Sequence, residues 1–490
     1  MSGAHMSGAH MSGGGLNAPG LNAPEADLAW TGAGDIAAGI RAGRLTATGV
    51  VAAALARIAR DNPRLNAFTD VTAARAVARA RAIDAGLAAG RPAGPLAGVP
   101  FAVKNLIDIA GLPTRAGSAI NRDHPPAGRD ATLVARLEAA GAVLVGGLNM
   151  GEYAYDFTGE NVHDGPSRNP HDLARMTGGS SGGSGGAVAG GLVPIALGSD
   201  TNGSIRVPAS FCGVFGLKPT YGRLSRAGSF PFVASLDHLG PLARSAADLA
   251  LAYDAMQGPD PADPVCAERA AEPVSPTLDA PIDGLRIAIA GGYFRAGACL
   301  EAISALETVA AALRPVRAIE LPEAARARAA AFVITTTEGA ALHLARLRTR
   351  AGDFDPDVRD RLIAGAMLPA AHVAQAQKFR RWYRDAMLAL FASVDVILAP
   401  ATPCVAPRIG QKTLVLDGTE VPLRPNIGIY TQPISFIGLP VVAVPVALPG
   451  GLPAAVQLIG APWREDLVLR LAHALERRGV VGAPRPPMAA

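Results

Sequence analysis

The sequence predicts an α/β fold in which one large domain encloses a buried β-sheet. Short apolar segments of strand character alternate along the chain with Ala- and Arg-rich segments of helical periodicity, the pattern of α/β proteins. The hydrophobic fraction of 49% supplies a sizeable core, and no linker divides the pattern. Residues 1–24 differ, because their MSGAH and GLNAP repeats cannot bury a core. We therefore expect a disordered low-complexity tail at residues 1–25 and a single domain at residues 26–485.

The predicted elements follow one another in a regular order. The segment TGVVAAALARIARDNPRLNAF has helical spacing and ends near Pro63, and a second Ala/Arg-rich helix is predicted at residues 72–89. Further helices are predicted at residues 131–140, 246–256 and 467–477. Strands are predicted, in chain order, in GVPFAVKNLIDIAG, AVLVGGLN, VPIALGS, LRIAIAGG, VDVILAPATP and LPVVAVPVAL. Residues 258–281, rich in Pro, Asp and Ala, are predicted to form a surface excursion within the domain.

Composition and charge exclude several classes of protein. The net charge is only +4, and the basic residues form no block with aromatics of the kind that binds nucleic acid. The chain has no run of about 18 apolar residues to cross a membrane and no apolar signal-peptide core. The four cysteines form no Cys-x-x-Cys pair and no zinc-type cluster. We expect a cytoplasmic protein without metal or cofactor, in which His163–Asp164 and His171–Asp172 are turn residues.

The most informative stretch is MTGGSSGGSGGAVAGGLVPIALGSDTNGSIRVPASFCGVFGLKPT at residues 176–220. Its first part has the composition of a flexible linker, but it leads directly into an apolar run, and it lacks the Gly-Lys-Ser/Thr ending of a phosphate-binding loop. Gly178-x-Ser180-x-Gly182 also fits the nucleophile elbow of α/β-hydrolases. That elbow needs a preceding strand, whereas NPHDLARMT predicts a turn. It also needs a late histidine, and the candidate, His473, falls in an amphipathic helix.

GGSSGGSGGAVAGG followed by LGSDTNGSIRVPASFCGVFGLKPT resembles the signature of the amidase-signature family. VPFAVKNLIDIAG resembles the lysine segment of that family. GAVLVGGLNMGEYAYDFTGEN, VDVILAPATP and LPAAVQLIGAPWREDLVLRLA match further landmarks, so the resemblance covers residues 28–478. It implies the amidase-signature fold, a single large domain with a central mixed β-sheet surrounded by helices, and hydrolysis of an amide.

The resemblance also implies a catalytic triad. Ser204 is the nucleophile, Ser180, which follows a cis peptide bond, relays the proton, and Lys104 is the base. A lysine can act as a base only where burial lowers its pKa, because desolvation disfavours the ammonium form. Lys104 stands between the apolar residues Val103 and Leu106, which indicates that it is buried.

The loop around Ser204 is expected to hold the oxyanion of the reaction. The resemblance implies backbone donors from Thr201, Asn202, Gly203 and Ser204. Most family members have Gly-Gly before the serine, and Asn202 is expected to preserve the loop because Asn tolerates positive φ. Its amide is also a candidate substrate contact. Supporting roles are expected for Asp200 and Arg206, as an ion pair bracing the loop, and for Ser181, in the same hydrogen-bond network. Cys212 is expected to be a packing residue.

Two positions indicate the charge of the substrate. In the glutaminase subunits of tRNA amidotransferases, which share this family, an Arg binds the glutamine carboxylate and an Asp binds its amino group. Arg361 in DPDVRDRLIAG aligns with the first, whereas Gly428 in GIYTQP replaces the second. The resemblance therefore implies a small carboxylated urea or amide without an ammonium group, cleaved with release of ammonia. Two alternative functions are hydrolysis of another anionic amide, such as oxalurate in purine breakdown, and a glutaminase-type activity. The alternative interpretation of Arg361 is an exposed helix residue with a purely structural role.

The family resemblance also bears on partners. The glutaminase member of the tRNA amidotransferases binds a small helical protein that wraps over its surface. We therefore expect a small helical accessory subunit, with either a homodimer or a heterotetramer of two large and two small subunits. The mean hydropathy of +0.24 agrees with a large interface, although Ala-rich helices alone also explain it.

Overall fold

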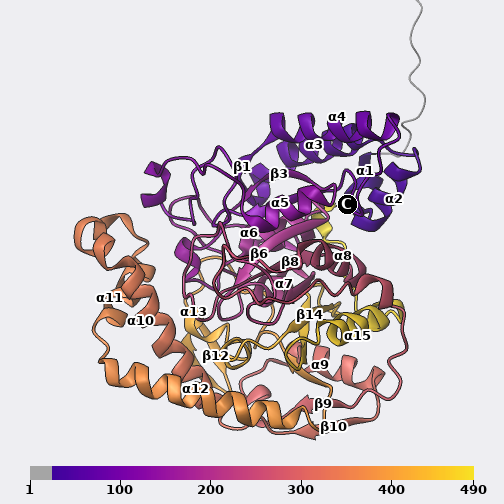
Figure 1. Cartoon of the computed structure of the whole chain (residues 1–490). Coiled ribbons are helices and arrows are strands. Elements are labelled where there is room, and N and C mark those ends of the chain that lie inside the picture. The colour runs from indigo at the N-terminus through magenta and orange to yellow at the C-terminus, as the bar shows by residue number, and fades with distance from the viewer. Residues whose placement is uncertain (1–24, 490) are drawn as a thin grey trace, which may run out of the picture.

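An 11-stranded mixed β-sheet forms the centre of the computed structural model, which describes residues 25–489 (Figure 1). The predicted α/β domain with a central mixed sheet is confirmed. The tail predicted at residues 1–25 lies outside the described residues except for Glu25, where helix α1 (Glu25–Trp30) begins. Across the sheet the strands are β1 (Phe68–Val71), β3 (Val143–Leu148), β2 (Pro100–Lys104), β6 (Ile195–Asp200), β8 (His238–Ala243), β7 (Phe215–Lys218), β14 (Val441–Val446), β15 (Ala454–Gly460), β11 (Val396–Pro400), β9 (Ile287–Ala290) and β10 (Val316–Ile319).

Two groups of parallel strands lie within this sheet. β3, β2 and β6 are parallel neighbours, as are β11, β9 and β10. Every residue of β2, β3 and β6 is buried, which explains why these segments are continuous apolar runs and not alternating patterns. Val103 pairs with Leu197 in the register of β2 and β6. The ends of both strands, with Lys104 on one and Ser199 on the other, therefore lie side by side.

Helices cover the sheet (Figure 1). They are α2 (Ala33–Arg41), α3 (Ala47–Leu65), α4 (Ala73–Ala88), α5 (Thr132–Ala139), α6 (Gly182–Ala189), α7 (Arg206–Cys212), α8 (Ala246–Met256), α9 (Leu300–Ala312) and α15 (Glu465–Arg477). Of two short helices, α13 (Leu423–Asn426) packs against a separate hairpin of β12 (Thr413–Leu416) and β13 (Thr419–Pro422), and the other is α14 (Gln432–Ser435). The predicted helices are present, and α3 ends two residues after Pro63, where Asn66 adopts the left-handed conformation. No helix within residues 25–489 is long and apolar enough to cross a membrane.

Three further helices form an arm along one side of the molecule (Figure 1). They are α10 (Ala324–Arg350), α11 (Pro356–Ala366) and α12 (Ala370–Leu390), and α11 and α12 pack mainly against α10. α10 also packs against α14, so the arm reaches the centre of the protein along this helix. The sequence analysis did not predict these helices, although they carry residues that border the candidate site.

One local prediction is wrong. NPHDLARMT was predicted to be a turn, but it contains the hairpin strands β4 (Arg168–Asn169) and β5 (Asp172–Met176). The segment is extended because it bonds with a distant part of the chain, as Met176 N–H donates to Pro407 O and Arg175 bridges to Arg408. The hairpin is separate from the main sheet, and His473 contacts Asp279 on the surface, so the geometry of a nucleophile elbow is absent from residues 25–489.

Candidate active site

Lys104 lies at the end of β2, fully buried among three serine hydroxyls. Its Nζ atom is 2.6 Å from Ser180 Oγ, 2.8 Å from Ser199 Oγ and 3.1 Å from Ser181 Oγ. Lys104 and Ser180 are 76 positions apart in the chain, and the sheet together with α6 brings them into contact. A neutral amine donates two hydrogen bonds and accepts one, so three hydroxyl partners satisfy the uncharged form of this lysine.

The electrostatics of the site favour the uncharged lysine. Burial lowers the pKa of Lys104 to about 7, because desolvation outweighs the opposing effect of the carboxylates Asp200, Asp237 and Asp156. These carboxylates make no direct hydrogen bond to Nζ among the described residues. Lys104 is therefore poised to exchange a proton near neutral pH.

The Gly-Ser segment that carries Ser180 is packed structure and not a linker. All residues from Thr177 to Ala189 are buried, and α6 begins at Gly182. A Cβ atom on Gly179 would lie 2.6 Å from Asp156 Oδ2, and one on Gly183 would lie 2.4 Å from Ala67 O. The glycines are therefore required because backbone and side chains approach closely. The peptide bond between Gly179 and Ser180 is cis.

Ser204 lies in the loop that joins β6 to α7. Gly203 has a φ of 140°, and its missing Cβ would lie 2.2 Å from Thr431 Oγ1, so only glycine fits. The tolerance of Asn for positive φ is not used at Asn202, because the residue of this loop with positive φ is Gly203. The residues of the loop are buried, and Ser204 is 3% exposed.

The backbone N–H groups of Thr201, Asn202, Gly203 and Ser204 have no protein acceptor within residues 25–489. Buried N–H groups are almost always paired in native proteins, so four consecutive free donors mark a place where another molecule supplies the acceptor. An oxyanion meets this requirement.

A buried ion pair fixes the base of the same loop. Arg206 Nε is 3.0 Å from Asp200 Oδ2, and both side chains are fully buried. Arg206 also donates to Gln457 Oε1 at 2.6 Å and to Thr431 O at 3.2 Å. Burial raises the pKa of the Asp200 carboxyl and the Arg206 guanidinium lowers it, and the net shift is downward, so the pair stays charged.

Cys212 is buried, and burial raises the pKa of its thiol, which makes it a poor nucleophile.

Tyr155 and Phe157 contact the two positions that concern substrate charge, Arg361 and Gly428. Arg361 Nη2 donates to Tyr155 O at 2.5 Å, and the guanidinium lies 4.0 Å from the centre of the Tyr155 ring. Arg361 forms no ion pair with a carboxylate of the described chain, and desolvation lowers its pKa. At the second position a Cβ on Gly428 would lie 2.5 Å from the Phe157 ring. Phe157 therefore occupies the space that an acidic side chain at position 428 needs.

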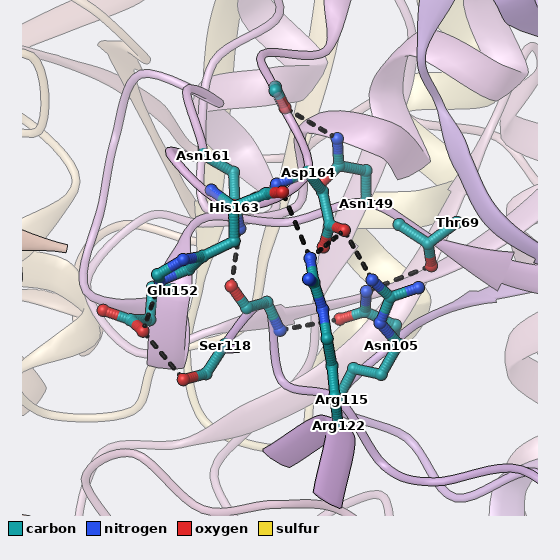
Figure 2. A network of polar contacts seen from close by, with 12 residues as sticks. Thr69, Asn105, Arg115, Ser118, Arg122, Asn149, Glu152, Asn161, His163 and Asp164 are labelled. Carbon is teal, nitrogen blue, oxygen red and sulfur yellow. Dashed lines mark hydrogen bonds and ion pairs between the residues drawn. The ribbon is translucent and has the colours of Figure 1, made fainter. Parts of the chain in front are cut away.

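Figure 2 shows the polar network that supports this region. Glu152 is fully buried and accepts hydrogen bonds from Ser118 Oγ at 2.7 Å and from Asp355 N–H, at the start of α11, at 2.7 Å. His163 Nε2 is 2.9 Å from Glu152 Oε1, and Asp164 pairs with Arg115. His163 and Asp164 are therefore parts of a structural network. Within residues 25–489 no group of three or more His, Cys, Asp or Glu residues could hold a metal ion.

A cavity of about 250 Å³ opens beside the site. Ser199 and Thr201 line it together with the aromatic residues Phe230 and Phe232. The hydroxyl of Thr201 donates to Asp237 Oδ1 at 2.6 Å. A small substrate thus has a path to the neighbourhood of the lysine and the loop.

Sequence reasoning missed four residues of the site: Ser199, Tyr155, Asp237 and Thr431. A signal for Ser199 was present, because Lys104 lies in one predicted strand segment and Ser199 ends another. The other three become neighbours only through tertiary packing, and nothing local in the sequence marks them.

The chain matches known proteins over most of its length. The profile of the family described as Amidase matches residues 49–469. The chain is 56% identical over 449 residues to AtzE of Pseudomonas sp. (strain ADP), described as part of the 1-carboxybiuret hydrolase, covering 91% of this chain and 98% of that one. It is 40% identical to the A chain of the glutamyl-tRNA(Gln) amidotransferase of Roseiflexus castenholzii (strain DSM 13941 / HLO8), over 89% of this chain and 93% of that one.

A solved structure has the same fold over nearly the whole chain. It is described as an unexpected vestigial protein complex that reveals the evolutionary origins of an s-triazine catabolic enzyme. The match has a TM-score of 0.92 and 54% identity, and it covers 93% of this chain and 100% of that one.

Proposed function

The chain belongs to the amidase family of hydrolases, which act on carbon–nitrogen bonds of amides, and from this premise we propose that it hydrolyses 1-carboxybiuret with release of ammonia. The likeness to the Pseudomonas 1-carboxybiuret hydrolase supports the substrate. The observation that carries the catalytic part is the 2.6 Å contact between the buried Lys104 Nζ and Ser180 Oγ.

We assign the three triad residues the following roles. Neutral Lys104 accepts a proton from Ser180, which takes one from Ser204 as the Ser204 oxygen attacks the terminal amide carbonyl. The N–H groups of Thr201 to Ser204 hold the oxyanion. The proton then passes to the leaving nitrogen, the carbon–nitrogen bond breaks, and ammonia departs from an acyl-enzyme. Water then attacks the carbonyl of this ester and gives a proton to the Ser180–Lys104 pair. The Ser204 oxygen leaves and takes a proton back, which releases a dicarboxylated urea.

The charged groups around the site support an anionic substrate. Arg361 is partly buried without a carboxylate partner in the described chain, so a substrate carboxylate would complete its ion pair. Gly428 and Phe157 leave no room for an acidic anchor, which disfavours glutamine because its ammonium group would have no partner there. Oxalurate carries the same carboxylate and remains the second candidate.

A panel of amides tests this proposal. Ammonia release would be compared for 1-carboxybiuret, biuret, oxalurate, malonamate and glutamine at equal enzyme concentration. The proposal predicts the highest kcat/KM for 1-carboxybiuret and the lowest for glutamine. A preference for oxalurate would identify oxalurate hydrolysis as the activity instead. A preference for glutamine would reject a carboxylated urea as the substrate.

We also propose an accessory partner, because the structural relative is described as a protein complex. A small helical subunit would cover part of the surface and give a heterotetramer of two large and two small subunits. Co-expression with any small reading frame found beside its gene, followed by light scattering, tests this. A fully active and monodisperse monomer made without that frame would contradict it.

A further inference from the structure

Asn202 carries a buried amide group on the loop that precedes Ser204. The residue is 7% exposed, and its Nδ2 donates a 2.9 Å hydrogen bond to Thr335 Oγ1 on α10. Its backbone oxygen accepts from Thr431 Oγ1 at 2.7 Å. The loop backbone and the side-chain amide are therefore both held in place, from two separate segments of the chain.

The other end of the amide has no partner. Asn202 Oδ1 is buried and accepts no hydrogen bond within residues 25–489. Burying an acceptor without a donor costs free energy, and native proteins rarely leave one unpaired unless another molecule supplies the donor. Thr335, which is 1% exposed, fixes the amide through Nδ2, so Oδ1 keeps one direction.

The residue that carries this unpaired oxygen belongs to the loop of the expected oxyanion donors. Asn202 contributes one of the four free N–H groups assigned to the oxyanion. Thr335 stands one helical turn before Gly339, where a Cβ would lie 3.0 Å from Phe232, and Phe232 lines the cavity. The Asn202–Thr335 pair is thus next to the wall of the cavity.

We propose that Asn202 Oδ1 faces the bound substrate and accepts a hydrogen bond from an N–H group on the acyl side of the scissile carbonyl carbon, opposite the leaving nitrogen. Urea-type amides such as biuret and carboxybiuret carry that N–H, whereas carboxamides such as malonamide and glutamine carry a methylene group there. Asn202 is then the residue that selects urea-type substrates, with Thr335 as its positioning residue. The inference rests on the proposed function for the identity of the site and goes beyond it in naming the substrate atom that is recognised.

Biuret and malonamide form a matched pair for the test, because both are neutral and differ only in N–H against CH₂. The measurement is the ratio of kcat/KM for biuret to that for malonamide, in wild type, Asn202→Ala, Thr335→Val and the double variant. If an amide reacts too slowly, its inhibition constant against the best substrate replaces kcat/KM. Circular dichroism and thermal melting confirm that each variant is folded.

The proposal predicts that Asn202→Ala lowers the ratio of kcat/KM for biuret to that for malonamide at least about tenfold, because the loss falls mainly on the substrate that carries the N–H. Thr335→Val should lower the ratio by a smaller factor, and the double variant should match Asn202→Ala. An equal loss for both amides, or no loss, overturns the proposal. A wild type that prefers biuret to malonamide but ignores carboxybiuret would reject the proposed function alone.

Discussion

The burial of Lys104 predicts that the rate is controlled by one ionisation near neutral pH. A lysine in water titrates at about 10.5, whereas desolvation lowers the pKa of Lys104 to about 7. At pH 7 about half of the molecules hold the neutral amine, against roughly one in 3,000 for an unshifted lysine. Below pH 7, kcat/KM should therefore fall about tenfold per pH unit, and above pH 8 it should level off.

The assay is ammonia release between pH 5.5 and 9 with a neutral amide, so that the substrate itself does not titrate. Lys104→Arg is the matched variant, because guanidinium keeps its proton throughout this range. It should lose at least about a thousandfold in kcat/KM and recover nothing at pH 9. An acid limb with a midpoint above pH 9, or an active Arg variant, would refute the neutral-lysine mechanism.

The pH dependence of the free energy of unfolding tests the same pKa independently. The folded pKa lies below the unfolded one, so between pH 7 and about 10.5 the unfolded chain binds a proton that the folded chain does not. The destabilising effect of Lys104 is therefore complete below pH 7 and fades as the pH rises. Urea denaturation should show wild type gaining stability relative to Lys104→Met from pH 7 to 9. A pH-independent difference would contradict the shifted pKa.

Three further predictions concern substrate charge and packing. Arg361→Ala should raise KM for an anionic amide about 10- to 100-fold more than for a neutral amide of similar size, since a charge-assisted hydrogen bond contributes about 1.5–3 kcal/mol; equal changes would exclude a role in recognition. Gly428→Ala should lower the free energy of unfolding by about 1–3 kcal/mol through overpacking against Phe157, and Phe157→Leu should restore part of it. Asp200→Asn leaves Arg206 buried without a counter-ion and should cost about 3–5 kcal/mol in urea denaturation, so a cost below about 1 kcal/mol would contradict the bracing role.

The sequence predicted six strands of the main sheet, β2, β3, β6, β9, β11 and β14, and every residue of these six strands is buried. Continuous apolar runs at β2, β3 and β6 indicate strands without any knowledge of their neighbours. The hairpin strand β5 was missed, because its polar residues become extended only by bonding to residues near Pro407. Its conformation is a tertiary effect that local propensity does not contain.

The site was predictable to the extent that motifs carry it. The Gly-Ser segment and the loop before Ser204 could be recognised from their residues. The requirement for glycine at position 203 could not, because it comes from the close approach of Thr431, which is 228 positions away in the chain. In the same way the unpaired oxygen of Asn202 depends on its partner Thr335, on a helix that the sequence analysis did not predict. Long-range contacts of this kind set the details of the site.

The nucleophile assignment is tested most directly by the activity of Ser204→Ala. Ser184→Ala is the matched control. Ser184 is a buried serine of the Gly-Ser segment that carries Ser180, and its Oγ donates to Leu197 O at 2.9 Å. With both variants folded as judged by thermal melting, we predict that Ser204→Ala loses about three or more orders of magnitude in the rate of ammonia release, while Ser184→Ala stays within about tenfold of wild type. A Ser204→Ala enzyme that keeps more than about a hundredth of the wild-type rate would contradict the account.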